Sequence, residues 1–236
     1  MRFTQPLISG VLVRRYKRFL ADVRLADGTV VTVHCPNSGS MLSCQESGRL
    51  VLISRSSNEN RKFAYTWEMI RMGRVWVGIN TSRPNRIVRK AIETGKILDL
   101  RGYPEILSEV PFGERSRVDL LLRGHGTSCY VEVKNVSLVE NGIAYFPDSV
   151  TERGTKHLRE LSTRVRHGDR AVMFYLVQRS DGRIFRPADH IDPLYGKTLR
   201  RALQEGVEIL VYRARVSPRG IEIAGRLPYE ILPLPR

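Results

Sequence analysis

The sequence predicts a mixed α/β protein with two parts, an OB-like small β-barrel over residues 1–80 and a mixed sheet with flanking helices over residues 81–236. Three observations predict this class. Short alternating strands and turns fill the first part, and helical and strand patterns alternate in the second. Residues 171–178 form an almost wholly apolar strand, which suits the centre of a covered sheet.

The strands of the first part are short and separated by turn-forming residues. We expect them over 8–14, 19–25, 29–34, 49–54 and 75–79. Asp27-Gly28 marks a hairpin turn between the second and the third of these strands. Short strands at this density are typical of a small barrel of the OB type, a scaffold that often binds oligonucleotides.

The second part shows the order α-β-β-β-α-β-α-β. Its first helix has Thr81 or Ser82 as a cap, Pro84 in its first turn and Gly95 at its end. The later elements are expected as strands over 105–112, 117–123, 129–135, 171–178 and 207–213, and as helices over 155–167 and 196–205. This order indicates helices packed against one mixed sheet.

The net charge is the most unusual feature of the composition. The chain has 39 Lys and Arg residues against 24 Asp and Glu residues, which gives +15 at pH 7, and its isoelectric point is near 10.3. Both parts of the chain carry the excess. Such a charge is typical of a nucleic-acid binder, so we expect DNA as the partner and do not exclude RNA. An anionic membrane surface is the other partner that this charge would suit.

Cysteine usage and hydropathy indicate a cytoplasmic protein with reduced thiols. Association with the nucleoid is compatible with this location. Cys35, Cys44 and Cys129 are too few and too scattered for a disulfide framework. Cys35 and Cys44, beside His34, lack the further ligands that a metal site would need. No stretch approaches the ~18–20 apolar residues of a membrane span, and the N-terminus has no apolar core of signal-peptide length. We therefore expect no membrane contact, and a homo-oligomer stays open.

The segment from Val118 to Asn135 carries the chemistry. It consists of two apolar strands around a turn at 124–127, and a turn centred there places Asp119 opposite Glu132. Glu132 and Lys134 share a face, because side chains alternate along a strand. The other face is expected to be apolar and to hold Val118, Leu120, Leu122, Val131 and Val133.

Two carboxylates opposite each other on adjacent strands destabilise a sheet unless a partner compensates their charge. A divalent cation such as Mg²⁺ or Mn²⁺ is one such partner, since it binds protein carboxylates, water and substrate phosphate. A metal there would polarise a phosphodiester and help to make hydroxide from water, and Lys134 could orient that water or stabilise the transition state. The alternative is a structural ion pair in which Lys134 or Arg117 neutralises the acids.

This order of elements, with Asp119 and Glu132-Val133-Lys134, resembles the PD-(D/E)xK (restriction-endonuclease-like) nuclease superfamily. A closer resemblance, over almost the whole chain, is to the sugar fermentation stimulation protein A family. The segments that carry it are RRYKRFLADV (14–23), VTVHCPNSGSM (31–41), YTWE (65–68), SEVPFGERSRVDLLL (108–122), CYVEVKNVSL (129–138), YFPDSVTERGTKHLREL (145–161) and IDPLYG (191–196). The resemblance implies an OB-like domain, a PD-(D/E)xK-like domain, DNA binding and a regulatory role in sugar (maltose) metabolism.

The resemblance also implies site residues. Asp119, Glu132 and Lys134 match the acid, acid and lysine of the superfamily, and the backbone carbonyl of Val133 is a further metal ligand. Many such nucleases place another acid on the helix before the hairpin. Here Glu93 is expected to face solvent, and Glu109 is the stand-in that we expect near Asp119.

Two basic clusters are candidate nucleic-acid contacts. Basic residues interleaved with aromatic ones suit phosphate contact and base stacking, and the first cluster holds Arg14, Arg15, Tyr16, Lys17 and Arg18. Alternatively, Tyr16 and Phe19 belong to the barrel core. The second cluster is Arg153, Lys156 and His157, at the start of a helix whose free N–H groups favour a phosphate.

The function that these features predict is largely sequence-nonspecific DNA binding together with a metal-dependent phosphodiesterase site. The alternative is a non-catalytic DNA-binding regulator that retains the nuclease-like fold. Whether nucleic acid is cleaved, and which substrate structure is preferred, does not follow from the sequence.

Overall fold

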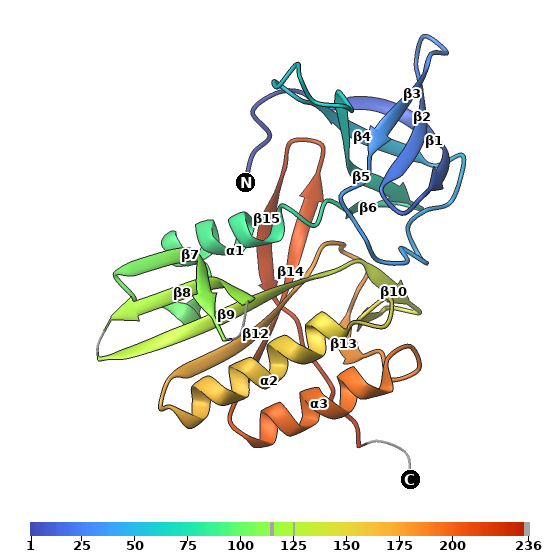
Figure 1. The fold of residues 1–236 in the computed structure, drawn as a ribbon. Helices are drawn as coiled ribbons and strands as arrows, with labels where there is room; N and C mark the ends of the chain where they lie inside the picture. The colour runs from blue at the N-terminus through green and yellow to red at the C-terminus, as the bar shows by residue number, and fades with distance from the viewer. Residues whose placement is uncertain (114–115, 125, 234–236) are drawn as a thin grey trace.

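The computed structural model describes residues 1–113, 116–124 and 126–233 (Figure 1). It has the predicted mixed α/β architecture, with an N-terminal barrel beside a C-terminal mixed sheet and its helices. No helix in these ranges combines the length and the apolar character needed to span a bilayer. Cys35, Cys44 and Cys129 are free and buried.

The barrel is built mainly from antiparallel strand pairs, and the pair that closes it is parallel. Its strands are β1 (Ile8–Tyr16), β2 (Leu20–Leu25), β3 (Val30–His34), β4 (Leu50–Arg55), β5 (Tyr65–Met72) and β6 (Val75–Gly78). Their order is β3-β2-β1-β4-β5-β6, and pairing of His34 with Thr66 joins β3 to β5 and closes the barrel. Strand β5 was not expected, because the charged Glu68 interrupts its apolar pattern; that side chain is completely buried.

The C-terminal sheet has the order β15-β14-β12-β9-β8-β7. Its strands are β7 (Glu105–Phe112), β8 (Ser116–Gly124), β9 (Thr127–Val136), β12 (Arg170–Val177), β14 (Glu208–Ser217) and β15 (Gly220–Arg226). The apolar strand β12 lies between β9 and β14 and is parallel to both, as its composition predicts. A small separate sheet, which was not expected, consists of β10 (Leu138–Glu140), β11 (Ile143–Phe146) and β13 (Ile184–Pro187).

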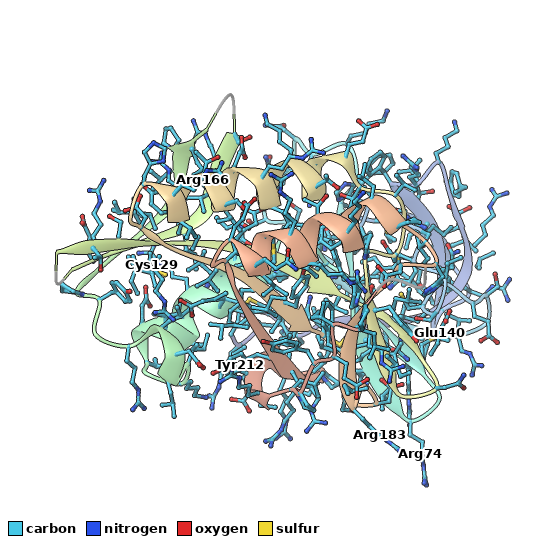
Figure 2. The ribbon with its side chains drawn as sticks, turned by 90° about the horizontal axis from the view of Figure 1, so that it is seen from below. Arg74, Cys129, Glu140, Arg166, Arg183 and Tyr212 are labelled. Carbon is cyan, nitrogen blue, oxygen red and sulfur yellow. The ribbon has the colours of Figure 1, made fainter. Side chains whose placement is uncertain are left out.

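Helices cover both faces of the C-terminal sheet. Helix α1 (Pro84–Glu93) packs on one face, and α2 (Glu152–Arg166) and α3 (Pro193–Gln204) lie side by side on the other (Figure 2). A short 3-10 turn, η1 (Leu98–Leu100), follows α1. Each face therefore has its own apolar core.

The prediction of one polar face on the β8–β9 hairpin is wrong. Val136 and Tyr130 share the face of Glu132 and belong to the core under α2. Val118 also belongs to that core, whereas Leu120 and Leu122 lie in the core under α1. The physical reason is that helices bury the hairpin from both sides, so polar side chains are confined to the end of the sheet.

Helix α1 begins at Pro84 and has Arg83 in its N-cap position, so neither Thr81 nor Ser82 is the cap. Within the described chain Arg83 makes no side-chain capping bond, whereas Ser82 bonds the side chain of Asn80. Pro84 occupies the first turn as predicted, and Gly95, with φ of 68°, follows the end of the helix. Helix α2 begins three residues earlier than expected, with Thr151 as its cap.

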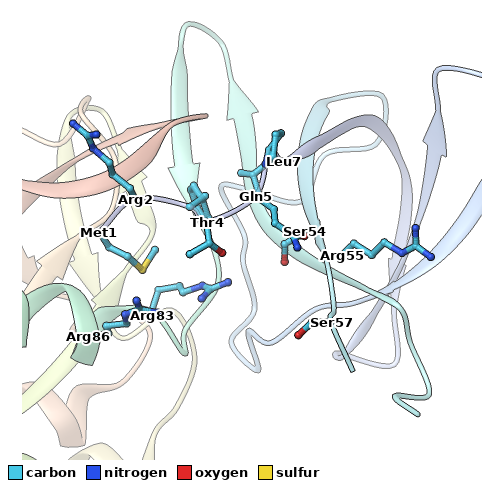
Figure 3. A pocket seen from close by; sticks show the side chains of 12 residues that line it. Met1, Arg2, Thr4, Gln5, Leu7, Ser54, Arg55, Ser57, Arg83 and Arg86 are labelled. Atoms are coloured by element: carbon cyan, nitrogen blue, oxygen red, sulfur yellow. The ribbon is translucent and has the colours of Figure 1, made fainter. Parts of the chain in front are cut away.

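The seam between barrel and sheet is held by polar contacts. The Arg83 guanidinium lies 2.5 Å from a carboxylate oxygen of the buried Glu68, which also accepts hydrogen bonds from Ser54 and Asn80. The Gly78 N–H donates to the Gln178 carbonyl at 2.9 Å. The N-terminal segment runs along this seam beside Arg83 and Arg86 (Figure 3).

Replacing Arg83 by alanine is expected to lower the free energy of unfolding by about 3 kcal/mol, because it leaves the Glu68 charge buried without its cation. Chemical denaturation would measure the loss. Arg89→Ala is the matched control, since the Arg89–Glu93 pair is partly exposed and should contribute less than about 1 kcal/mol. Equal losses in both variants would contradict this role for Arg83.

Candidate functional site

A cleft of 430 Å³ lies where the barrel meets the C-terminal sheet. One wall comes from the barrel and includes Arg18 and Gly39. The opposite wall includes Asp119, Glu132 and Lys134, the residues predicted for catalysis. The structure therefore brings the predicted acid, acid and lysine together.

The register of the hairpin places the two acids beside each other. Leu120 pairs with Val131 and Leu121 with Tyr130, which is the predicted register. In this register Glu132 and Val133 lie next to Asp119, and the Val133 N–H donates to Asp119 Oδ2 at 2.7 Å.

Asp119 is held from two sides. Asn85 on α1 donates to Asp119 Oδ1 at 2.7 Å, while Val133 bonds the other oxygen. Burial, followed by the negative charge of Glu132, raises the pKa of Asp119 to about 6. Near neutral pH this carboxylate is therefore ionised although its surroundings destabilise the ionised form. A nearby cation would stabilise that form.

Glu132 is 3% exposed. Its Oε1 accepts from Lys134 Nζ at 2.7 Å and also bonds His157 Nδ1. Burial raises the pKa of Glu132, but the charge of Lys134 and the bond to His157 outweigh burial, so the pKa lies below its usual value. Its second oxygen, Oε2, is buried and finds no hydrogen-bond partner among the described residues. A buried carboxylate oxygen in this condition is a natural ligand for a cation.

His157 does not lie on the surface, where a nucleic-acid contact was expected. Its side chain is 3% exposed, and its Nδ1 lies 3.2 Å from Lys134 Nζ. Arg153 Nε contacts the other ring nitrogen at 3.4 Å. The sequence holds a signal for this position, because His157 precedes the apolar Leu161 by four residues and thus shares the buried face of α2.

Asn85 is a site residue that sequence reasoning missed. It stands on α1, the helix on which the resemblance to the PD-(D/E)xK superfamily implies an acid, and its amide contacts both Asp119 and, at 3.3 Å, Glu109. Its spacing of three residues from the buried Val88 could have indicated that it faces the sheet. Glu93 pairs instead with Arg89 and Lys90, consistent with its expected outward orientation.

The residues predicted as metal ligands supply a small donor set. Glu109 is exposed, in a strand position with φ of 54°, and reaches Asp119 through the shared Asn85 amide. Across residues 1–113, 116–124 and 126–233, no group of three or more His, Cys, Asp or Glu side chains is arranged to hold a metal ion. A cation here would depend on Asp119, Glu132, a backbone carbonyl such as that of Val133, water and phosphate.

The first basic cluster divides into residues with different roles. The guanidinium of Arg15 donates to the carbonyls of Asn37 and Gly39, at 2.9 and 2.8 Å, so it holds the 37–40 loop rather than projecting freely. Arg14 and Tyr16 both bond Asp22.

Lys17 and Arg18 form the turn between β1 and β2, with φ of 48° and 61°. Arg18 faces the cleft. Tyr16 and Phe19 lie outside the barrel core, and Phe19 is 48% exposed.

The second basic cluster lies in the first two turns of α2, and its members face different surroundings. Arg153 lines the cleft, whereas Lys156 is exposed and does not line it, with Nζ 3.7 Å from Glu160. Arg153 and the buried His157 therefore form a chain of contacts from Glu132 to the wall of the cleft.

Two family models match the chain. Residues 13–79 match the SfsA N-terminal OB domain, and residues 82–220 match the sugar fermentation stimulation protein RE domain. The chain belongs to the sugar fermentation stimulation protein family. The predicted resemblance is thus confirmed, and the two matched domains of this family member supply the two walls of the cleft.

Relatives and a solved structure agree with this assignment. The sugar fermentation stimulation protein homolog of Geobacter metallireducens is 60% identical and covers 97% of this chain and 99% of its own. The homolog of Acidithiobacillus ferrooxidans is 53% identical and covers 93% of this chain and 95% of its own. The solved structure of Pyrococcus furiosus SfsA in complex with Ca²⁺ is 27% identical, with a TM-score of 0.89 over 98% of each chain.

The raised pKa of Asp119 predicts a pH dependence of stability in this family member. Because the folded protein holds the proton more tightly than the unfolded chain, this stabilisation is complete below about pH 3.9 and is lost as the pH rises through about 6. Without divalent cations, the free energy of unfolding should therefore fall between pH 4 and pH 7 by about 2 kcal/mol more than in Asp119→Asn.

Denaturant unfolding at several pH values would measure this difference, and adding Mg²⁺ should reduce it in the unsubstituted chain alone. If the stability of the unsubstituted chain and that of Asp119→Asn changed with pH in the same way, the pKa of Asp119 would not be raised by folding, and the prediction would be contradicted.

Proposed function

We propose that this protein binds DNA with little sequence preference and hydrolyses phosphodiester bonds with the help of Mg²⁺ or Mn²⁺. The observation that carries the proposal is the pairing of the partly buried Asp119 with the buried Glu132 in a cleft, where Glu132 Oε2 has no hydrogen-bond partner among the described residues and Lys134 lies beside it. Two such acids with a lysine form a chemically complete set for this reaction.

The donor set suits a hard divalent cation. Asp119, Glu132 and the carbonyl of Val133 would hold it, with Glu109 within reach of the Asp119 side of the site. The cation would polarise the phosphodiester and lower the pKa of a bound water. The complex of Pyrococcus furiosus SfsA with Ca²⁺ supports a cation in this family fold.

The residues around the carboxylates position the reacting groups. Lys134 Nζ, 2.7 Å from Glu132, is placed to contact a phosphate oxygen or the attacking water at the same end of the sheet. His157 bonds Glu132 and lies beside Lys134, so it fixes the direction of both side chains from α2. Asn85 does the same for Asp119 from α1.

The charge of +15 supports a cytoplasmic polyanion as partner. Arg14, Lys17, Arg18, Arg153 and Lys156 are the proposed phosphate contacts, and Tyr16 offers a ring beside them. Arg15 would contribute indirectly, by holding the loop that forms the barrel wall of the cleft.

A second candidate function is a non-catalytic DNA-binding regulator of sugar metabolism. The observation that favours it is the Glu132–Lys134–His157 cluster, in which the acid is already compensated by an ion pair. In that case the site would stabilise the fold, and DNA binding would not depend on divalent cations.

Lys134→Ala is expected to reduce Mg²⁺- or Mn²⁺-dependent cleavage by at least roughly 100-fold, because it removes a cation aimed at the charge of the transition state. Cleavage of single-stranded, duplex and branched DNA and of RNA would be followed on gels. Lys96→Ala is the control, since the side chain of Lys96 is half-exposed beside Glu222 and does not line the cleft.

The two candidate functions give opposite results. Purified protein that binds DNA in EDTA and cleaves none of these substrates would support the regulator and contradict the phosphodiesterase.

A further inference from the structure

The two-domain construction of the cleft limits what can reach the carboxylates. Arg18 and the 37–39 segment of the barrel face Asp119 and Glu132 across it. A nucleic acid must therefore pass between the domains, and the spacing of the two walls decides which form of nucleic acid fits.

The barrel wall is fixed to the C-terminal domain rather than free to swing. The Met41 N–H donates to Asp148 Oδ2 at 3.0 Å, and Ser40 Oγ bonds the Asp148 carbonyl. Arg15 holds the carbonyls of the same loop from behind. Thr81 Oγ1 donates to the carbonyl of Pro36 at 2.7 Å, at the start of the loop.

Gly39 sets how closely the walls approach. A Cβ atom at this position would lie 2.4 Å from Asp148 Oδ1, well inside van der Waals contact. Only glycine permits this approach without a shift of the loop or of Asp148. The close spacing of the walls therefore depends on Gly39 as well as on the hydrogen bonds of the loop, and a substitution at Gly39 can change it.

The size of the cleft matches one strand. Pockets for small molecules measure about 300–1,000 Å³, so a cleft of 430 Å³ has room for one or two nucleotides. A duplex carries two backbones and its stacked base pairs together, so it is bulkier than one strand and fits a cleft of this volume less well.

The lining also suits an unpaired strand. Arg18 and Arg153 offer positive charge from opposite walls, and Val150, 71% exposed, adds an apolar side chain at the rim beside Pro147. The faces of unstacked bases can pack on such apolar groups, whereas the bases of a duplex are already stacked on one another.

We propose that the cleft selects single-stranded nucleic acid, gripping one backbone between the barrel loop and the carboxylate end of the sheet, and that the contact of Gly39 with Asp148 sets this selection. The inference rests on the proposed function for the place where the strand would be cut. It does not require that cutting occurs.

Fluorescence anisotropy at fixed salt tests the selection in the full chain carrying Lys134→Ala, which prevents cleavage. The probes are DNA and RNA single strands of about 12 nucleotides, within the site size of an OB fold, and a DNA duplex of the same length. Either single strand should bind at least about tenfold more tightly than the duplex, the effect of roughly one stacked base.

Adding Gly39→Ala should reduce that preference to about twofold or less by moving the walls apart. Gly225→Ala is the matched control, because among the described atoms none lies within 4 Å of its added Cβ and its φ is not in the left-handed region. Circular dichroism would establish that both variants fold. Duplex binding as tight as single-strand binding, or a preference that folded Gly39→Ala leaves intact, would overturn the proposal.

A second measurement does not depend on the Gly39 variant. A single strand carrying 4-thiothymidine should crosslink to peptides from both walls, 36–41 and 146–153, and mass spectrometry would identify them. Crosslinks elsewhere only would overturn the proposal. Single-strand binding across the cleft without any cleavage by the unsubstituted chain would leave this inference standing and remove the phosphodiesterase; equally rapid cleavage of duplex would do the reverse.

Discussion

Two carboxylates, the partly buried Asp119 and the buried Glu132, lie on adjacent strands of a sheet that helices cover on both faces, and the surrounding site compensates their charge. Like charges in this position oppose each other, and their burial makes the opposition stronger. Glu132 is compensated by Lys134 and His157, whereas the hydrogen-bond donors that Asp119 has among the described residues, Asn85 and Val133, are neutral. The compensation is thus uneven, and a divalent cation between the two acids would complete it.

The barrel completes the site without supplying an acid to it. Its loop, held by Arg15 and anchored on Asp148, forms the second wall of the cleft. The buried Glu68–Arg83 contact joins β5 of the barrel to the start of α1, the helix that carries Asn85. The first turn of α1 therefore links the Glu68–Arg83 contact between the domains to the position of Asn85, which holds Asp119.

Much of this arrangement could be predicted from the sequence, because it depends on local patterns. Strand alternation and the turn at 124–127 gave the register that joins Asp119 to Glu132. The positions of His157 and Asn85 depend on which face of each helix meets the sheet. A basic or polar residue near the start of a helix is also typical of an exposed surface position, so its residue type alone does not predict that it contacts the site. The role of Arg15 could not be predicted, because its partners are backbone carbonyls more than twenty residues away.

Anomalous diffraction from crystals soaked in Mn²⁺ tests most directly whether Asp119 and Glu132 share a divalent cation. We expect an anomalous peak within coordinating distance of both carboxylates, and we expect it to be lost in crystals of Asp119→Asn. Well-ordered crystals with no peak between these carboxylates, or with Lys134 Nζ occupying that position in the presence of Mn²⁺, would contradict a shared cation.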